Sequence, residues 1–170
     1  MAIKKQRPQR ATLLAVGEGD SEVCFLKYLR SLYCANSAGV SVTVMNAHGK
    51  GPGNVINTAV GHRRMRAYDR ALALLDTDLE WTKKDRENAR KGKIELLGSS
   101  PCLEGLLLTV LGHPVPEQSR QCKVFLEKII EGDLTQLEVY ASSFSKPTLE
   151  AARQTTPTLD VLLRFLEGGA

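Results

Sequence analysis

The chain has 170 residues, of which 42% are apolar, and this fits one globular domain with a core of its own. Lys and Arg number 23 against 19 Asp and Glu, which gives a net charge of +4. No apolar run approaches the roughly 18 residues of a transmembrane helix, and the polar start lacks the apolar stretch of a secretory signal, so we expect a cytoplasmic protein without membrane contact. The four cysteines form no Cys-x-x-Cys pair and have no zinc spacing, which predicts reduced thiols.

The positive charge is unevenly distributed along the chain. Residues 1–93 hold 17 basic and 9 acidic side chains, whereas residues 94–170 hold 6 and 10. Residues 1–10 carry four basic side chains and no acid, so we expect a basic disordered tail there, followed by a single domain over residues 11–170. The asymmetry indicates a polyanionic partner such as nucleic acid; a solvated tail with ordinary surface charge explains it equally well.

The first half of the chain alternates strand and helix patterns. Residues 12–16 form a short apolar run closed by glycine, which predicts a buried strand. Apolar side chains at helical spacing predict a helix over residues 21–34. Residues 40–44 alternate valine with serine or threonine, the period of a strand. A glycine-rich loop over residues 47–54 then leads into a helix over residues 55–66.

The same alternation continues in the middle of the chain. A second apolar run, residues 71–75, predicts a strand inside the sheet. The charged segment 81–90 is expected to be helical, and residues 94–97 are expected to form a fourth strand. Two further helices are predicted over residues 103–110 and 117–131.

The chain ends in a predicted helix that begins with a capping threonine followed by proline. Its apolar stripe consists of Leu159, Leu162, Leu163 and Leu166. This stripe predicts core packing, with a homodimer through the C-terminal helix as the alternative. Alternating strands and helices predict an α/β fold: a compact, Rossmann-like, mostly parallel sheet of about four strands flanked by helices, with a C-terminal helical extension.

Acidic residues follow two of the predicted strands. Glu18 comes just after the first strand, and Asp76 and Asp78 come just after the third. Ligands of open parallel sheets bind outside the carboxyl ends of the strands, where these side chains would meet. Clustered carboxylates repel one another unless a cation joins them, so the pattern predicts a Mg²⁺ or Mn²⁺ site. Glu22 faces the same place or only favours the positive end of its helix, and Asp78 is alternatively a turn residue.

The glycine-rich loop follows the second strand at the same edge. Its glycines would expose backbone N–H groups to a phosphate, and Lys50 would add a positive charge. His48 is a candidate acid or base. No Gly-Lys-Ser/Thr sequence closes the loop, so it is not a Walker loop; a flexible turn is the alternative.

Basic side chains cluster after the second predicted helix and again after Asp78. Such clusters bind a phosphate backbone, although acids interspersed in the second cluster also fit a solvated helix face. The candidate nucleic-acid contacts are Lys50, Arg63, Arg64, Arg66, Lys83 and Lys84.

Three segments resemble a known family. VGEGDSE at residues 16–22 resembles the first motif of Toprim domains in its Glu-Gly-x-x-Glu form, and LLDTD at residues 74–78 resembles their second motif, the DxD strand. SPCLEGLLL at residues 100–108 is similar to the Pro-Cys-x-Glu helix of RloB-like proteins. Over roughly residues 12–130 the chain therefore resembles Toprim proteins of the RloB-like and OLD-type branch.

The resemblance implies a Toprim fold and Mg²⁺-dependent processing of nucleic-acid phosphodiesters, as by a nuclease. Glu18 would be the acid/base or metal-site glutamate, and Asp76 and Asp78 would be metal ligands. Glu22 and Glu104 would be supporting ligands. The resemblance also implies a separate ATPase partner and a place in bacterial restriction or phage defence.

Two alternatives to a nuclease stay open at this point. The Pro-Cys segment has Ser100, Leu103 and Leu106 where the family has asparagine, an aromatic residue and tryptophan. This departure motivates a non-catalytic nucleic-acid-binding or assembly module on the same fold. A phosphatase of the haloacid dehalogenase type is the further alternative, because LLDTD resembles its nucleophile motif.

Overall fold

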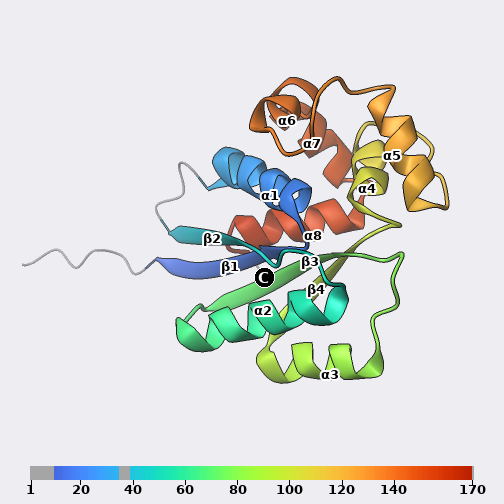
Figure 1. Ribbon diagram of the computed structural model, residues 1–170. Helices are drawn as coiled ribbons and strands as arrows, with labels where there is room; N and C mark the ends of the chain where they lie inside the picture. Colours follow the sequence, from blue (N-terminus) through green and yellow to red (C-terminus); the bar gives the residue numbers. More distant parts are fainter. Residues whose placement is uncertain (1–9, 35–38, 170) are drawn as a thin grey trace, which may run out of the picture.

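The computed structural model describes residues 10–34 and 39–169, so most of the expected basic tail lies outside the described residues. The described chain forms a parallel sheet in the order β2-β1-β3-β4 (Figure 1). The strands are β1 (Ala11–Gly17), β2 (Val40–Asn46), β3 (Arg70–Asp76) and β4 (Ile94–Ser99). The predicted α/β class with a parallel sheet of about four strands is therefore confirmed.

Helices cover both faces of this sheet (Figure 1). On one face, α2 (Pro52–Met65) and α3 (Lys83–Gly92) pack on alternate strand residues such as Leu14 and Leu75. On the other, α1 (Asp20–Tyr33), α4 (Leu103–Val110) and α8 (Pro157–Leu166) pack on the intervening ones, such as Leu13 and Leu74. The two central strands are buried on both sides, which is why their sequences are continuously apolar.

Three short helices extend the α1 face: α5 (Ser119–Glu127), α6 (Leu137–Ser143) and α7 (Lys146–Arg153). Tyr140 of α6 is fully buried, with its ring 5.5 Å from that of Phe25 and 5.9 Å from that of Tyr28. The sequence patterns predicted neither α6 nor α7, because each is a short helix with only two buried side chains and so shows no apolar stripe like that of α4. In the described parts of the chain, no helix combines the length and apolarity needed to cross a membrane.

The leucine stripe of α8 lies in the core. Leu159, Leu162, Leu163 and Leu166 are each 0% exposed. The core packing predicted for them is confirmed, and a homodimer through this stripe would require the leucines to leave the core.

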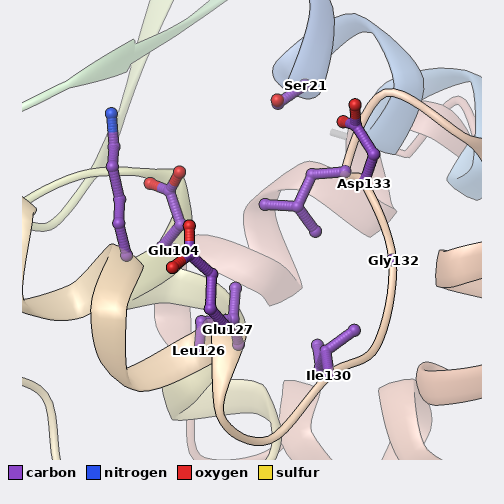
Figure 2. A pocket seen from close by; sticks show the side chains of 9 residues that line it. Ser21, Glu104, Leu126, Glu127, Ile130, Gly132 and Asp133 are labelled. Atoms are coloured by element: carbon purple, nitrogen blue, oxygen red, sulfur yellow. The ribbon is translucent and has the colours of Figure 1, made fainter.

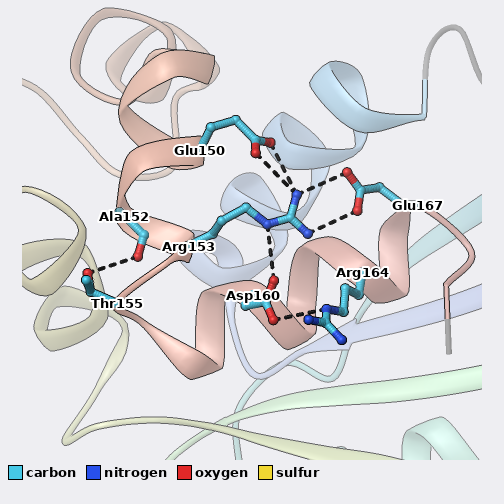
Figure 3. A network of polar contacts seen from close by, with 7 residues as sticks. All are labelled: Glu150, Ala152, Arg153, Thr155, Asp160, Arg164 and Glu167. Carbon is cyan, nitrogen blue, oxygen red and sulfur yellow. Dashed lines mark hydrogen bonds and ion pairs between the residues drawn. The ribbon is translucent and has the colours of Figure 1, made fainter.

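A single arginine joins α7 to α8 above that core (Figure 3). The Arg153 guanidinium lies 3.3 Å from a Glu150 oxygen, 3.2 Å from Asp160 and 3.1 Å from Glu167. Arg164 pairs with the other oxygen of Asp160 at 3.0 Å. Three carboxylates in this corner therefore have a cation built into the fold.

Candidate metal centre at the carboxyl edge of the sheet

Adjacent strands deliver the candidate carboxylates to one edge of the sheet. Glu18 follows β1, and Asp76 ends β3, which pairs directly with β1. Glu22 lies in the first turn of α1 and Glu104 in the first turn of α4, and both helices begin at this edge. We refer to Glu18, Glu22, Asp76, Asp78 and Glu104 as the acidic edge.

Asp76 is the centre of the acidic edge. Its Oδ1 accepts a hydrogen bond from the backbone N–H of Leu103 at 3.0 Å, at the start of α4. Burial raises the pKa of Asp76 to about 8, with further contributions from the charges of Glu22, Glu18, Asp78 and Glu104. Four predicted ligands thus lie near enough to Asp76 to disfavour its ionised form.

Glu22 has a structural role as well as a place in this cluster. Only 9% of it is exposed, and its Oε2 accepts a hydrogen bond from the backbone N–H of Gly19 at 2.9 Å, which caps α1. Burial is the main cause that raises its pKa. The helix turns back so closely that a Cβ on Gly17 would lie 2.9 Å from the Glu22 Cβ, so glycine is needed at this point. The helix-start role of Glu22 is observed, and its charge also acts on Asp76.

Asp78 lies in an exposed turn that is anchored to two other segments. Its Oδ2 accepts a hydrogen bond from the Ser119 hydroxyl at 2.6 Å, and its backbone N–H donates to the Pro101 carbonyl at 3.0 Å. The turn role and the position on the acidic edge therefore coexist. Ser119, the first residue of α5, was not singled out in the sequence, because no local pattern connects it with Asp78.

The acidic edge fits a hard divalent cation by its chemistry and charge. All five donors are carboxylates, the ligands that Mg²⁺ and Mn²⁺ prefer, and their repulsion at Asp76 would be relieved by a cation. Within residues 10–34 and 39–169, no three His, Cys, Asp or Glu side chains are already grouped so that they could hold a metal ion. Side chains of the acidic edge would have to turn toward a common point to share one ion.

The glycine-rich loop between β2 and α2 is held by specific hydrogen bonds. Residues 48–51 all have positive φ angles, between 59° and 80°. The Gly49 N–H donates to the Glu18 carbonyl at 2.8 Å, and the His48 N–H donates to Asn46 Oδ1 at 2.7 Å. Asn54 Nδ2 donates to the Ala47 and Gly49 carbonyls, each at 2.8 Å. These bonds tie the loop to the acidic edge, but they occupy the Gly49 amide, one of the glycine N–H groups expected to face a phosphate.

The predicted basic clusters are placed at opposite ends of the sheet. Lys83 and Lys84 open α3 and Lys50 lies in the glycine-rich loop, so all three are exposed on the side of the acidic edge. Arg63, Arg64 and Arg66 lie at the other end of α2, near the start of β3. Arg63 donates to the Gly92, Lys93 and Asp69 carbonyls, which is a structural role. These three candidate contacts therefore lie at the opposite end of the sheet from the acidic edge.

An aromatic–cation pair beside Asp78 was missed in the sequence. Trp81 Nε1 donates to the Asp76 carbonyl at 3.0 Å, and the Arg86 guanidinium lies 5.3 Å from the Trp81 ring centre. Both line a hollow of about 430 Å³ with Thr77, Asp78, Leu79 and Glu80. Trp81 precedes α3, and its spacing of five residues from Arg86 is not the three- or four-residue spacing of neighbours on a helix, so no local pattern connects the two.

We compared the chain with protein-family models, with curated proteins and with solved structures. None of them matches it. The chemistry of the acidic edge is therefore argued from its own residues.

Proposed function

We propose that the chain is a Toprim-like, Mg²⁺-dependent enzyme that cleaves nucleic-acid phosphodiester bonds. The observation that carries the proposal is the acidic edge around Asp76, where burial and four other carboxylates raise the pKa of Asp76 to about 8. Such a cluster lies where ligands of parallel sheets bind, and in the part of the chain that the structure describes no arginine pairs with it as Arg153 pairs with the acids of α7 and α8.

The residues divide into metal-holding and substrate-holding groups. Glu18, Asp76 and Asp78 would hold Mg²⁺ or Mn²⁺, with Glu22 and Glu104 as supporting carboxylates. A bound ion would polarise a phosphoryl oxygen and lower the pKa of a bound water. Glu18 is the candidate acid/base, with His48 and Lys50 as further catalytic candidates, because both side chains are exposed in a loop tied to Glu18.

Substrate contacts on the same side would come from basic and aromatic groups. Lys50, Lys83 and Lys84 would attract the phosphate backbone, and Trp81 with Arg86 would stack on an unpaired base. Arg63 is left out of this set because its guanidinium is bonded to backbone carbonyls. By the sequence resemblance, the proposal extends to a separate ATPase partner, a role in bacterial defence and a place in the cytoplasm.

The second candidate is a non-catalytic nucleic-acid-binding module on the same fold. It is favoured by the Pro-Cys segment, which has Ser100, Leu103 and Leu106 where the family that it resembles has asparagine, an aromatic residue and tryptophan.

A cleavage assay separates the two candidates. Single- and double-stranded DNA and RNA are incubated with the protein in Mg²⁺, in Mn²⁺ and in EDTA. We expect metal-dependent cleavage that falls by about 100-fold or more in Asp76→Ala, because the ion would supply several kcal/mol of transition-state stabilisation. Glu87→Gln, which removes an exposed charge from α3, is the matched control and should keep its activity.

Two results would decide against the enzyme. One is calorimetry without uptake of Mg²⁺ or Mn²⁺ at millimolar concentration. The other is salt-sensitive nucleic-acid binding that EDTA leaves unchanged and that no cleavage accompanies, which is the result expected of the non-catalytic module.

A further inference from the structure

A cavity of about 380 Å³ opens beside the acidic edge, between the start of α1, the helices α4 and α5, and the loop that follows α5 (Figure 2). Pockets that bind small molecules in proteins have volumes of about 300–1,000 Å³. The sequence patterns gave no sign of this cavity, because its walls come from segments more than 100 residues apart, from Ser21 to Leu134.

The cavity combines an apolar floor with an acidic rim. Leu126 and Ile130 are 2% and 6% exposed and, with Leu134, line its apolar part. Glu104 and Glu127 lie together on one side, and Asp133 lies across from them (Figure 2). Lys123 is the one basic residue of the lining, so the wall carries three acids against one base.

The carboxylates of Glu127 and Asp133 on the rim are available to pair with a cationic ligand. Hydrogen bonds from Thr135, including a backbone N–H at 2.8 Å, lower the pKa of Asp133, so its carboxylate is ionised at neutral pH. Within the described part of the chain, Glu127 has no ion-pair partner, and Lys123 pairs with none of the rim acids. The acids are thus held around a hollow without a cation of the fold between them.

We propose that this cavity binds an organic cation with an apolar stem, and that a guanidinium group of the arginine type fits it best. The stem would pack on Leu126, Ile130 and Leu134, while the head would lie between Glu127 and Asp133. A guanidinium forms paired hydrogen bonds to carboxylates and is more weakly hydrated than an ammonium, so it loses less on entering a half-apolar site. An anion would be repelled by the rim, and a bare metal ion would make no use of the apolar floor.

A cationic head on an apolar stem can come from two sources, a free small amine or an arginine side chain of a partner protein. Agmatine represents the first, and N-acetyl-arginine-amide and a short arginine-containing peptide represent the second. The citrulline analogue of the amide has nearly the same shape without the charge, so it is the matched control ligand. Binding is measured by calorimetry in EDTA, which keeps the proposed metal function out of the experiment.

We expect the cationic ligands to bind and the citrulline analogue to bind at least about tenfold more weakly, since it lacks the charge that pairs with the rim carboxylates. Tighter binding of the peptide than of agmatine assigns the site to a partner's arginine, and the reverse order assigns it to a free amine. Equal binding of the citrulline analogue, or no binding of any cationic ligand at millimolar concentration, would overturn the proposal.

Variants of the rim test the location. Glu127→Gln and Asp133→Asn should each weaken binding by about tenfold, and Lys123→Gln should strengthen it by removing a like charge. Asn at position 133 keeps an oxygen for the Thr135 N–H, so the loop retains its hydrogen bond. Glu131→Gln removes an equal charge next to the cavity, outside its lining, and should change little. Unchanged binding in both Glu127→Gln and Asp133→Asn, with intact thermal unfolding, would place the ligand elsewhere.

Discussion

Two groups of carboxylates in this molecule differ in how the repulsion between their charges is relieved. Between α7 and α8, three acids surround Arg153, whose side chain is only 17% exposed, and their hydrogen bonds raise the already high pKa of that guanidinium. Among the described residues no arginine forms an ion pair at the acidic edge, and the pKa of Asp76 rises to about 8 instead. The first group is paired with arginines within the fold, whereas the second is left to bind a proton or an external cation.

The difference follows from where the residues come from. Glu150 to Glu167 lie within two consecutive helices, so their pairing with Arg153 forms as α7 docks on α8. The acidic edge collects Glu18 and Glu22 from the segment that joins β1 to α1, Asp76 and Asp78 from the end of β3 and the turn after it, and Glu104 from α4. It therefore exists only once the sheet is assembled. A cluster of like charges brought together from separate segments destabilises the folded state, and such clusters are common at functional sites.

Removing the built-in cation should give the largest effect. Arg153→Met keeps the apolar stem but leaves three acids facing one another, and we expect a loss of about 2–3 kcal/mol in the free energy of unfolding, less than for a fully buried pair because the acids are partly exposed. Arg164→Met is the control: Arg164 is 59% exposed and pairs with Asp160 alone, so its loss should cost under about 0.5 kcal/mol. Equal losses in urea unfolding would contradict the central role of Arg153.

Removing the charge of Asp76, at the centre of the acidic edge, should have the opposite effect and raise the free energy of unfolding. Between its ordinary pKa of 3.8 and its raised pKa of about 8, Asp76 binds a proton in the folded chain but not in the unfolded one. Stability should therefore fall as pH rises from about 4 to about 8, and Asp76→Asn should remove this fall. Because Asp76 is partly exposed to solvent, we expect Asp76→Asn to gain about 1–2 kcal/mol in the free energy of unfolding at pH 8. Each kcal/mol corresponds to a rise of about 2–4 °C in Tm.

This second prediction is checked by thermal unfolding in EDTA across the pH range. The advantage of Asp76→Asn should shrink as the pH approaches 4. Asparagine keeps an acceptor for the Leu103 N–H, so the α4 start is preserved. A variant that is less stable than the wild type at pH 8 would show that the repulsion at Asp76 is not a net cost.

A divalent cation should relieve the same repulsion. Mg²⁺ or Mn²⁺ at ten times its Kd should stabilise the wild type by about 1.4 kcal/mol at pH 8, because it binds only the folded chain. Asp76→Asn should lose most of this gain, whereas Arg153→Met should keep it. Equal gains in the wild type and in Asp76→Asn would mean that the ion binds away from the acidic edge.

The smallest effect is expected from Glu150, one of the three acids that pair with Arg153. Glu150 is 43% exposed and contacts Arg153 at 3.3 Å, while Asp160 and Glu167 remain to pair with the arginine. Glu150→Gln should therefore change the free energy of unfolding by about 0.5 kcal/mol or less, measured by urea unfolding. A loss as large as that of Arg153→Met would show that the three acids act as one unit.

Local sequence patterns were informative where local physics dominates. Continuous apolar runs predicted the central strands β1 and β3, because these strands are buried on both faces, and the α8 stripe predicted a core helix. The position of Glu18 and Asp76 after parallel strands predicted that they would meet, because β1 and β3 end at one edge. The metal, the nucleic acid and the cleavage reaction stay predictions.

Features that join distant segments could not be predicted in this way. Arg63 and Lys83 were both candidate nucleic-acid contacts in the sequence, yet α2 and α3 place them at opposite ends of the sheet. The cavity beside Glu104 likewise needs α1, α4 and α5 to be packed before its walls exist.

The sequence by itself thus determined the alternation of strands and helices and the order in which acids follow the strands, because both depend on neighbours along the chain. Only the tertiary structure decided which carboxylates are paired with an arginine. Arg153 meets its three acids through helix docking. The acidic edge gathers its carboxylates from three separate segments, and among residues 10–34 and 39–169 no arginine forms an ion pair with them, because pairing across long loops depends on packing rather than on local sequence.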